Sequence, residues 1–239
     1  MRISPDLATL SRAAAQALAD LIAQRTAAGH LFSLVLSGGE TPRALYQLLA
    51  TEFRERIDWP KVHLFWGDER YVHRTDPRSN YRMVKESLLD RVSLPAANVH
   101  PMPTELPRPE ESALEYEAFL RAYFHSPPAP WPTFDLILLG LGEEGHTASL
   151  FPRSPALGEQ QRWVAAVRVP AEPPLRLTLT LPALNHAREV YFLAMGSRKA
   201  RAVRAGTAAA IGDGSCPAAM VRPQDGNLIW WIDQSAAPA

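Results

Sequence analysis

The chain has 239 residues, of which 46% are hydrophobic, enough for one large α/β domain with a substantial core. Lysine and arginine together number 25, as do aspartate and glutamate, so the formal net charge is zero. This balance argues against a nucleic-acid-binding or membrane-surface protein, whose surface is normally basic. It leaves room for a small anionic ligand, which needs only local positive charge.

The expected compartment is the cytoplasm. Cys216 is the single cysteine, so no disulfide forms within the chain, which fits a reducing compartment. No apolar run approaches the roughly 20 residues of a membrane-spanning helix. Residues 1–16 lack the apolar core and cleavage pattern of a signal peptide.

The first helix and strand lead to a glycine-rich junction. Ser4 and Pro5 predict a helix start, as N-cap and first helical residue, and Gly29 predicts its end. A strand at 31–36 follows, and then Ser37-Gly38-Gly39-Glu40-Thr41-Pro42-Arg43 opens another helix. Backbone N–H groups at such a junction bind phosphate, aided here by Thr41 and Arg43. A tight turn that needs glycine for its geometry explains the residues equally well.

A second strand, at 62–66, ends in Gly67-Asp68-Glu69-Arg70-Tyr71. Charged residues on a loop often form only a solvated cluster of salt bridges. The position beside a strand end favours a functional role for the Asp68-Glu69-Arg70 cluster. A turn at 76–81 then leads into a helix at 80–89.

The rest of the chain continues the alternation of strands and helices without a clear domain boundary. Its proline-rich segments, 94–109 and 127–132, are interpreted as surface loops, so residues 1–239 are expected to form one domain. The other predicted elements are a helix at 110–124, strands at 134–139 and 163–169, a half-exposed strand at 177–181, a turn or short helix at 182–186, a strand at 189–195, a helix at 200–205, and short strands at 216–221 and 228–232. The histidines left as structural or surface residues are His30, His63, His73, His100, His125 and His186.

The stretch from 134 to 152 is the centre of the predicted site. Its buried strand runs into Gly140-Leu141-Gly142, then Glu143, Glu144, Gly145 and His146, and a short helix that Pro152 ends. Ligands of open α/β sheets bind at the carboxyl ends of the strands, which places His146 at the rim. Histidine has an unperturbed pKa of roughly 6.5 and contributes roughly 10² to 10⁴-fold as a general base.

A third junction, Gly196-Ser197-Arg198-Lys199, adds cations at the same edge of a parallel sheet. Together the junctions predict a pocket with a positive end for phosphate, and with His146 and carboxylates at the other end. No HExxH, CxxC or GxSxG pattern occurs, so we expect neither a metal nor a cofactor, and no serine nucleophile.

Residues 140–145 formally match the GxGxxG dinucleotide fingerprint. Two carboxylates would then lie near the pyrophosphate, and the following helix is short. No strand ending in an acid follows about 20 residues later, as the fingerprint requires. We interpret the match as coincidental.

The motifs together resemble those of the 6-phosphogluconolactonase family. The matching blocks, in order, are Ser37-Gly38-Gly39-Glu40-Thr41-Pro42, Gly67-Asp68-Glu69-Arg70, Ser79-Asn80-Tyr81, Gly140-Leu141-Gly142 with Gly145-His146-Thr147-Ala148-Ser149-Leu150-Phe151-Pro152, and Arg176-Leu177-Thr178-Leu179-Thr180. The resemblance implies metal-independent hydrolysis of 6-phospho-D-glucono-1,5-lactone, the second step of the oxidative pentose phosphate pathway. It also implies a modified Rossmann-like α/β fold, with a mainly parallel sheet flanked by helices, shared with glucosamine-6-phosphate deaminases.

The resemblance implies roles for individual residues. His146 falls on the family's catalytic base, and Asp68 and Arg70 fall on its active-site block. The residues implied to bind substrate are Gly38, Gly39, Thr41, Arg43, Ser79, Asn80, Arg176 and Lys199. The chain departs from the family at Glu144, where the family usually has aspartate, so this carboxylate reaches one methylene further.

Two other functions remain as alternatives. A sugar-phosphate isomerase or deaminase would share the fold, but residues 147–152 argue against it because the deaminases carry another sequence there. A sugar-phosphate sensor should carry a DNA-binding module, for which the sequence leaves no room and no basic patch. We expect a monomer or a weak homodimer whose ligand is a small phosphosugar lactone.

Overall fold

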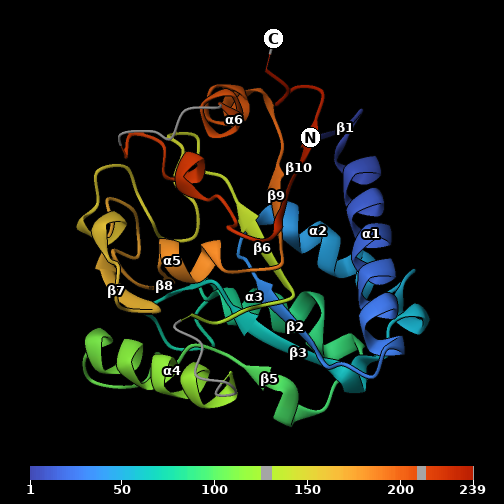
Figure 1. Ribbon diagram of the computed structural model, residues 1–239, viewed down its shortest axis with the longest axis horizontal. Coiled ribbons are helices and arrows are strands. Elements are labelled where there is room, and N and C mark those ends of the chain that lie inside the picture. Colours follow the sequence, from blue (N-terminus) through green and yellow to red (C-terminus); the bar gives the residue numbers. More distant parts are fainter. Residues whose placement is uncertain (125–130, 209–213, 239) are drawn as a thin grey trace.

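The computed structural model describes residues 1–124, 131–208 and 214–238, and its centre is a parallel sheet covered by helices (Figure 1). In spatial order the strands of this sheet are β1 (Arg2–Ser4), β10 (Asn227–Asp233), β9 (Glu189–Ala194), β6 (Leu136–Gly140), β2 (Phe32–Leu36), β3 (Val62–Trp66) and β5 (Val99–His100). The middle strands are buried on both faces, which is why they appear in the sequence as nearly continuous apolar runs. The predicted fold class, α/β with a mainly parallel sheet, is confirmed.

Three further strands form a small antiparallel sheet in the order β4 (Asp68–Arg70), β8 (Leu175–Leu179) and β7 (Val164–Arg168). Backbone hydrogen bonds at Gly67 join it to the large sheet: its N–H donates to Leu36 O at 2.9 Å, and its carbonyl accepts from Leu179 N at 2.8 Å. The small sheet therefore begins where β3 ends, at the carboxyl edge of the parallel strands.

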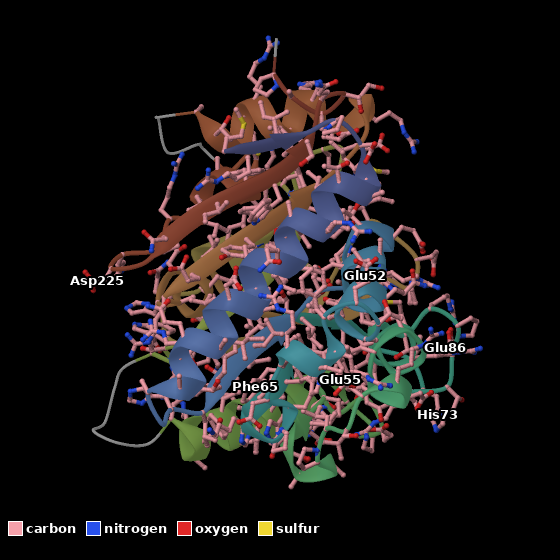
Figure 2. The ribbon with its side chains drawn as sticks, turned by 90° about the vertical axis from the view of Figure 1, so that its right-hand side faces the viewer. Glu52, Glu55, Phe65, His73, Glu86 and Asp225 are labelled. Atoms are coloured by element: carbon pink, nitrogen blue, oxygen red, sulfur yellow. The ribbon has the colours of Figure 1, made fainter. Side chains whose placement is uncertain are left out.

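The helices are α1 (Leu7–Ala27), α2 (Glu40–Leu49), α3 (Asn80–Ser87), α4 (Pro109–Tyr123), α5 (Leu181–Asn185) and α6 (Ala200–Thr207). Helix α4 lies against β7 and β8 (Figure 1). Figure 2 shows α1 crossing in front of the large sheet, with Glu52 beside it; Arg12 of α1 forms an ion pair with Glu52. These helices bury the apolar faces that the sequence pattern predicts.

The start of the chain differs from the prediction. Helix α1 begins at Leu7 and not at Pro5, because the side chain of Asp6 accepts a hydrogen bond from Thr9 N at 2.8 Å. Ser4 belongs instead to β1, where it pairs with Asp233. Three residues are too few to show a strand periodicity, so β1 could not be predicted from the sequence pattern.

Three other predicted elements were wrong. Residues 147–152 form no helix, since Ala148 has a φ of 49° and Thr147 bridges back to Leu150. Residues 217–220 form a 3-10 helix and not a strand. Asp68–Arg70 is a strand and not a loop.

Strand β8 is buried over four of its five residues, although its alternating pattern predicts a half-exposed strand. The hydroxyls on its polar face are satisfied by backbone carbonyls: Thr178 Oγ1 donates to Leu179 O, and Thr180 Oγ1, just after the strand, donates to Arg162 O. Burial therefore carries no penalty for these side chains. His125 and Pro127–Pro130, which the sequence assigned to the surface, lie outside the described residues.

Candidate active site

The predicted site residues meet in a cavity of about 420 Å³ at the carboxyl edge of the large sheet. Those that line it are Gly38, Gly39, Thr41, Asp68, Arg70, Asn80, His146, Arg176 and Lys199. A larger groove, of about 730 Å³, lies beside β7 and contains none of them. The convergence of titratable and cationic groups therefore marks the smaller cavity as the candidate active site.

Three predicted residues do not line the cavity. Ser79 is the N-cap of α3 and accepts from Arg82 N at 3.3 Å. The guanidinium of Arg43 lies 3.5 Å from the carboxylate of Glu40 in an exposed pair. Glu144 contacts the cavity-lining side chain of His146, whereas Ser79 and Arg43 lie outside the lining.

The turn that carries His146 is held by its own backbone. Gly142 N donates to His146 O at 2.8 Å, and Gly145 N donates to Gly142 O at 3.1 Å. Gly145 has a φ of +94°, a conformation that favours glycine. The imidazole stacks on Phe151, with ring centroids 4.1 Å apart and planes inclined by 14°. Backbone and ring contacts together fix the orientation of His146.

Glu144 determines which nitrogen of His146 carries the proton. Its Oε1 lies 2.9 Å from Nδ1 of the imidazole. A carboxylate only accepts hydrogen bonds, so Nδ1 carries the proton and Nε2 presents a lone pair. Partial burial acts to raise the pKa of Glu144, but the hydrogen bonds from its own backbone N–H and from His146, and the charge of Lys199, hold that pKa below its ordinary value.

The buried side chain of Asp68, on β4, is held in a network of hydrogen bonds. Its Oδ2 accepts from Ser149 Oγ at 2.7 Å, and its Oδ1 accepts from Asn80 Nδ2 at 3.3 Å. Asn80 Nδ2 also donates to the backbone carbonyl of Asp68 at 2.9 Å. Both oxygens of Asp68 are therefore fixed in place beside the cavity.

Arg70 and Arg176 are direct cross-strand partners on β4 and β8. Arg70 Nη1 donates to Arg78 O and Arg176 Nε donates to Pro173 O, both at 2.7 Å, and within the described chain neither side chain has a carboxylate within 4.0 Å. Burial, and next the charge of Arg70, lowers the pKa of Arg176. Like charges directly opposite one another destabilise a sheet, and a bound anion would relieve this repulsion.

The glycine turn faces the same cavity. Gly39 is the N-cap of α2 with a φ of +110°, and no side chain caps the helix there. A β-carbon on Gly38 would lie 2.0 Å from Asn80 Oδ1, so a larger residue there would displace the Asn80 side chain. Residues 38–42, which include the uncapped start of α2, line the cavity, and the first N–H groups of a helix are a common binding site for an anion.

Lys199 and Arg198 close the cavity on the side of β9. Burial lowers the pKa of Lys199, and the nearby carboxylates of Glu143 and Glu144 partly offset this. Arg198 Nη1 lies 3.2 Å from Glu143 Oε1. In the sequence, Arg198 had only its place beside Lys199 to suggest a role, and Ser149 had only its place in the block 145–152. No local pattern shows the bond of Ser149 to Asp68, which joins positions 81 residues apart.

Neither a metal site nor a membrane span emerges from the described part of the chain. No three or more of its histidine, cysteine, aspartate and glutamate side chains are arranged to hold a metal ion. None of its helices has the length and apolar character needed to cross a bilayer.

Residues 5–230 match the family model described as glucosamine-6-phosphate isomerases/6-phosphogluconolactonase. A 6-phosphogluconolactonase of Synechocystis sp. is 46% identical over 204 residues, covering 85% of this chain and 82% of the relative. One of Mycobacterium tuberculosis is 42% identical over 248 residues, covering 99% and 96%.

Comparison with solved structures gives matches to the same family. The 6-phosphogluconolactonase of Leishmania guyanensis has a TM-score of 0.87 at 27% identity, covering 98% of this chain and 96% of that one. The one from Thermotoga maritima has a TM-score of 0.83 at 29% identity, covering 97% and 98%. A monomeric glucosamine-6-phosphate deaminase has a TM-score of 0.81 at 20% identity, covering 99% and 98%, which shows a shared fold alone.

Proposed function

This chain belongs to the family of glucosamine-6-phosphate isomerases and 6-phosphogluconolactonases, and we propose that it is a lactonase of that family, a carboxylic ester hydrolase. It hydrolyses 6-phospho-D-glucono-1,5-lactone to 6-phospho-D-gluconate in the oxidative pentose phosphate pathway. The observation that carries this proposal is that His146, paired with Glu144, lines one cavity with Arg70 and Arg176, two arginines without a carboxylate partner among the described residues.

His146 acts as the general base. Nε2 takes a proton from water, and the hydroxide oxygen attacks the lactone carbonyl. The tetrahedral intermediate then expels the ring oxygen, which takes the proton back from the imidazolium to become a hydroxyl. The carboxylic acid that forms releases its proton to solvent and becomes a carboxylate. Glu144 stabilises the transient imidazolium through Nδ1.

Arg70 offsets the negative charge that develops on the carbonyl oxygen. The phosphate binds to the open N–H groups at the start of α2, with Arg176 and Lys199 supplying charge. Because the phosphate is remote from the reacting carbon, its binding energy orients the lactone ring at His146.

Glu144→Gln tests the orientation of the base. The amide nitrogen of glutamine can donate to Nδ1 and so favours the tautomer with its proton on Nε2, which cannot accept a proton from water. We expect kcat/KM to fall on the order of 10²-fold, with KM nearly unchanged. Glu144→Asp should retain more activity than Glu144→Gln; equal losses in the two variants would contradict a role in orientation.

Gly142→Ala tests the turn itself. A β-carbon at residue 142 would lie 2.1 Å from Nδ1 of His146 and 2.6 Å from Oε2 of Glu144. We expect kcat/KM to fall by roughly 10² because the base moves out of line. Gly158→Ala is the matched control, since its β-carbon would meet nothing within 4 Å. Full activity of Gly142→Ala in steady-state assays would contradict the proposed geometry.

We also propose one domain over residues 1–239, a monomer or weak homodimer, a cytoplasmic location and no cofactor. The single domain is supported by one cluster of buried side chains that extends from Leu10 to Ala236 and includes residues of both sheets. Light scattering at micromolar concentration measures the oligomeric state, and a tetramer would contradict the proposal.

A further inference from the structure

Glu69 is a buried carboxylate next to the cavity to which no role has been assigned above. It lies between Asp68 and Arg70 on β4, and side chains alternate along a strand. Asp68 and Arg70 therefore face the cavity, which both line, whereas Glu69 points away from it and is 2% exposed.

The carboxylate of Glu69 accepts hydrogen bonds from four donors. Oε1 accepts from Asn80 N and from Arg70 N, and Oε2 accepts from Tyr81 N, all at 2.7 Å. Oε2 also lies 3.3 Å from Ser79 Oγ. In the described residues no lysine, arginine or histidine lies within ion-pair distance of Glu69, so backbone N–H groups are its principal partners.

Burying a carboxylate without a cation beside it costs free energy. Burial raises the pKa of Glu69 to about 7, against the opposing effect of the backbone N–H groups. A buried charge without a counter-ion is rare, and here the first turn of α3 supplies the compensating dipole. An apolar side chain at residue 69 would leave those N–H groups without acceptors.

The contacts of Glu69 connect it to the cavity residues. It accepts hydrogen bonds from the backbone N–H groups of Arg70 and Asn80, and the Asn80 side chain in turn donates to Asp68. Asn80 also packs so closely on Gly38 that a β-carbon there would lie 2.0 Å from Oδ1. A shift in the first turn of α3 would therefore move residues on two sides of the cavity.

We propose that Glu69 is a positioning residue, which ties β4 to the first turn of α3 and so sets the spacing of Asp68, Arg70 and Asn80 around the substrate. Its own side chain does not line the cavity. The inference rests on the proposed function for its catalytic readout, but its structural part can be measured without turnover.

The test is Glu69→Gln with Glu117→Gln as its matched control. Glutamine has the same shape as glutamate but only one side-chain oxygen. Its NH₂ group would face the donors that surround Glu69 and could not accept hydrogen bonds from them. Glu117 on α4 is also buried and accepts from backbone N–H groups, of Trp163 at 2.9 Å and Val164 at 3.2 Å, but it does not line the cavity. Both variants should lower Tm.

Only Glu69→Gln should lower kcat/KM, by roughly 10- to 100-fold for a displacement of about 1 Å. The affinity for 6-phosphogluconate, measured by calorimetry, should fall with it. Activity of Glu69→Gln equal to that of wild type would overturn the proposal, as would equal proportional losses in both variants. If Glu69→Gln does not fold, Glu69→Asp replaces it: reduced kcat/KM supports the proposal and wild-type kcat/KM overturns it.

If the proposed function is wrong, the wild-type protein will not accelerate lactone hydrolysis, and this result is distinct from any effect of the Glu69 variants. The positioning role is then decided by calorimetry with inorganic phosphate as the probe. Weaker phosphate binding by the Glu69 variant than by Glu117→Gln supports the positioning role, and equal phosphate binding by both overturns it.

Discussion

Replacing His146 with alanine is expected to lower kcat/KM for the lactone by roughly 10² to 10⁴-fold, the contribution of a well-placed general base. The reason is the lone pair on Nε2, which the hydrogen bond from Nδ1 to Glu144 leaves available for a water molecule. KM should change little, because the residues proposed to bind the phosphate lie elsewhere in the cavity lining. The rate must be measured on fresh lactone, with the spontaneous hydrolysis subtracted.

His186→Ala is the control for this variant. His186 also stacks on an aromatic ring, that of Trp131, and its Nδ1 lies 2.7 Å from a backbone oxygen, but it does not line the cavity. It should keep wild-type activity. Equal rates for His146→Ala and wild type, both above the background, would remove His146 from the mechanism.

Arg176→Met is expected to raise KM and to weaken the binding of 6-phosphogluconate by roughly 30- to 5,000-fold, since the loss of one partner from a buried charge pair costs about 2–5 kcal/mol. A smaller effect on kcat is expected, because Arg176 is assigned to the phosphate and not to the reacting carbon. Titration calorimetry and steady-state kinetics on the same variant separate the two quantities.

Two further variants, Arg70→Met and Arg168→Met, are compared with Arg176→Met. Arg70 faces Arg176 across the sheet but is assigned to the oxyanion, so its removal should lower kcat more than it raises KM. Arg168 ends β7 in an exposed position outside the cavity and should be neutral. The assignment would be contradicted if Arg176→Met lowered kcat alone and left product affinity unchanged.

The sequence predicted the parts of the site that depend on local pattern. Buried apolar runs such as 62–66 end at glycines, and the carboxyl ends of parallel strands share one edge, so the approximate meeting of Gly38, Asp68 and His146 follows from strand order alone. Local chemistry also predicted the glycine turn at residue 39, where φ is positive.

Long-range pairing could not be predicted in the same way. The antiparallel register that sets Arg70 opposite Arg176 joins segments about a hundred residues apart, and no local periodicity encodes it. The same holds for the bond between Ser149 and Asp68. Glu69 looked like one member of a charged loop, and only the formation of β4 shows that it points away from its neighbours.

The most direct test of the account is the initial rate of hydrolysis of fresh 6-phospho-D-glucono-1,5-lactone by pure protein in buffer that contains EDTA. We predict a rate well above spontaneous hydrolysis, unaffected by the chelator and lost in His146→Ala. A rate equal to the spontaneous background, together with ammonia release from glucosamine 6-phosphate by the same preparation, would contradict the lactonase assignment and favour the deaminase.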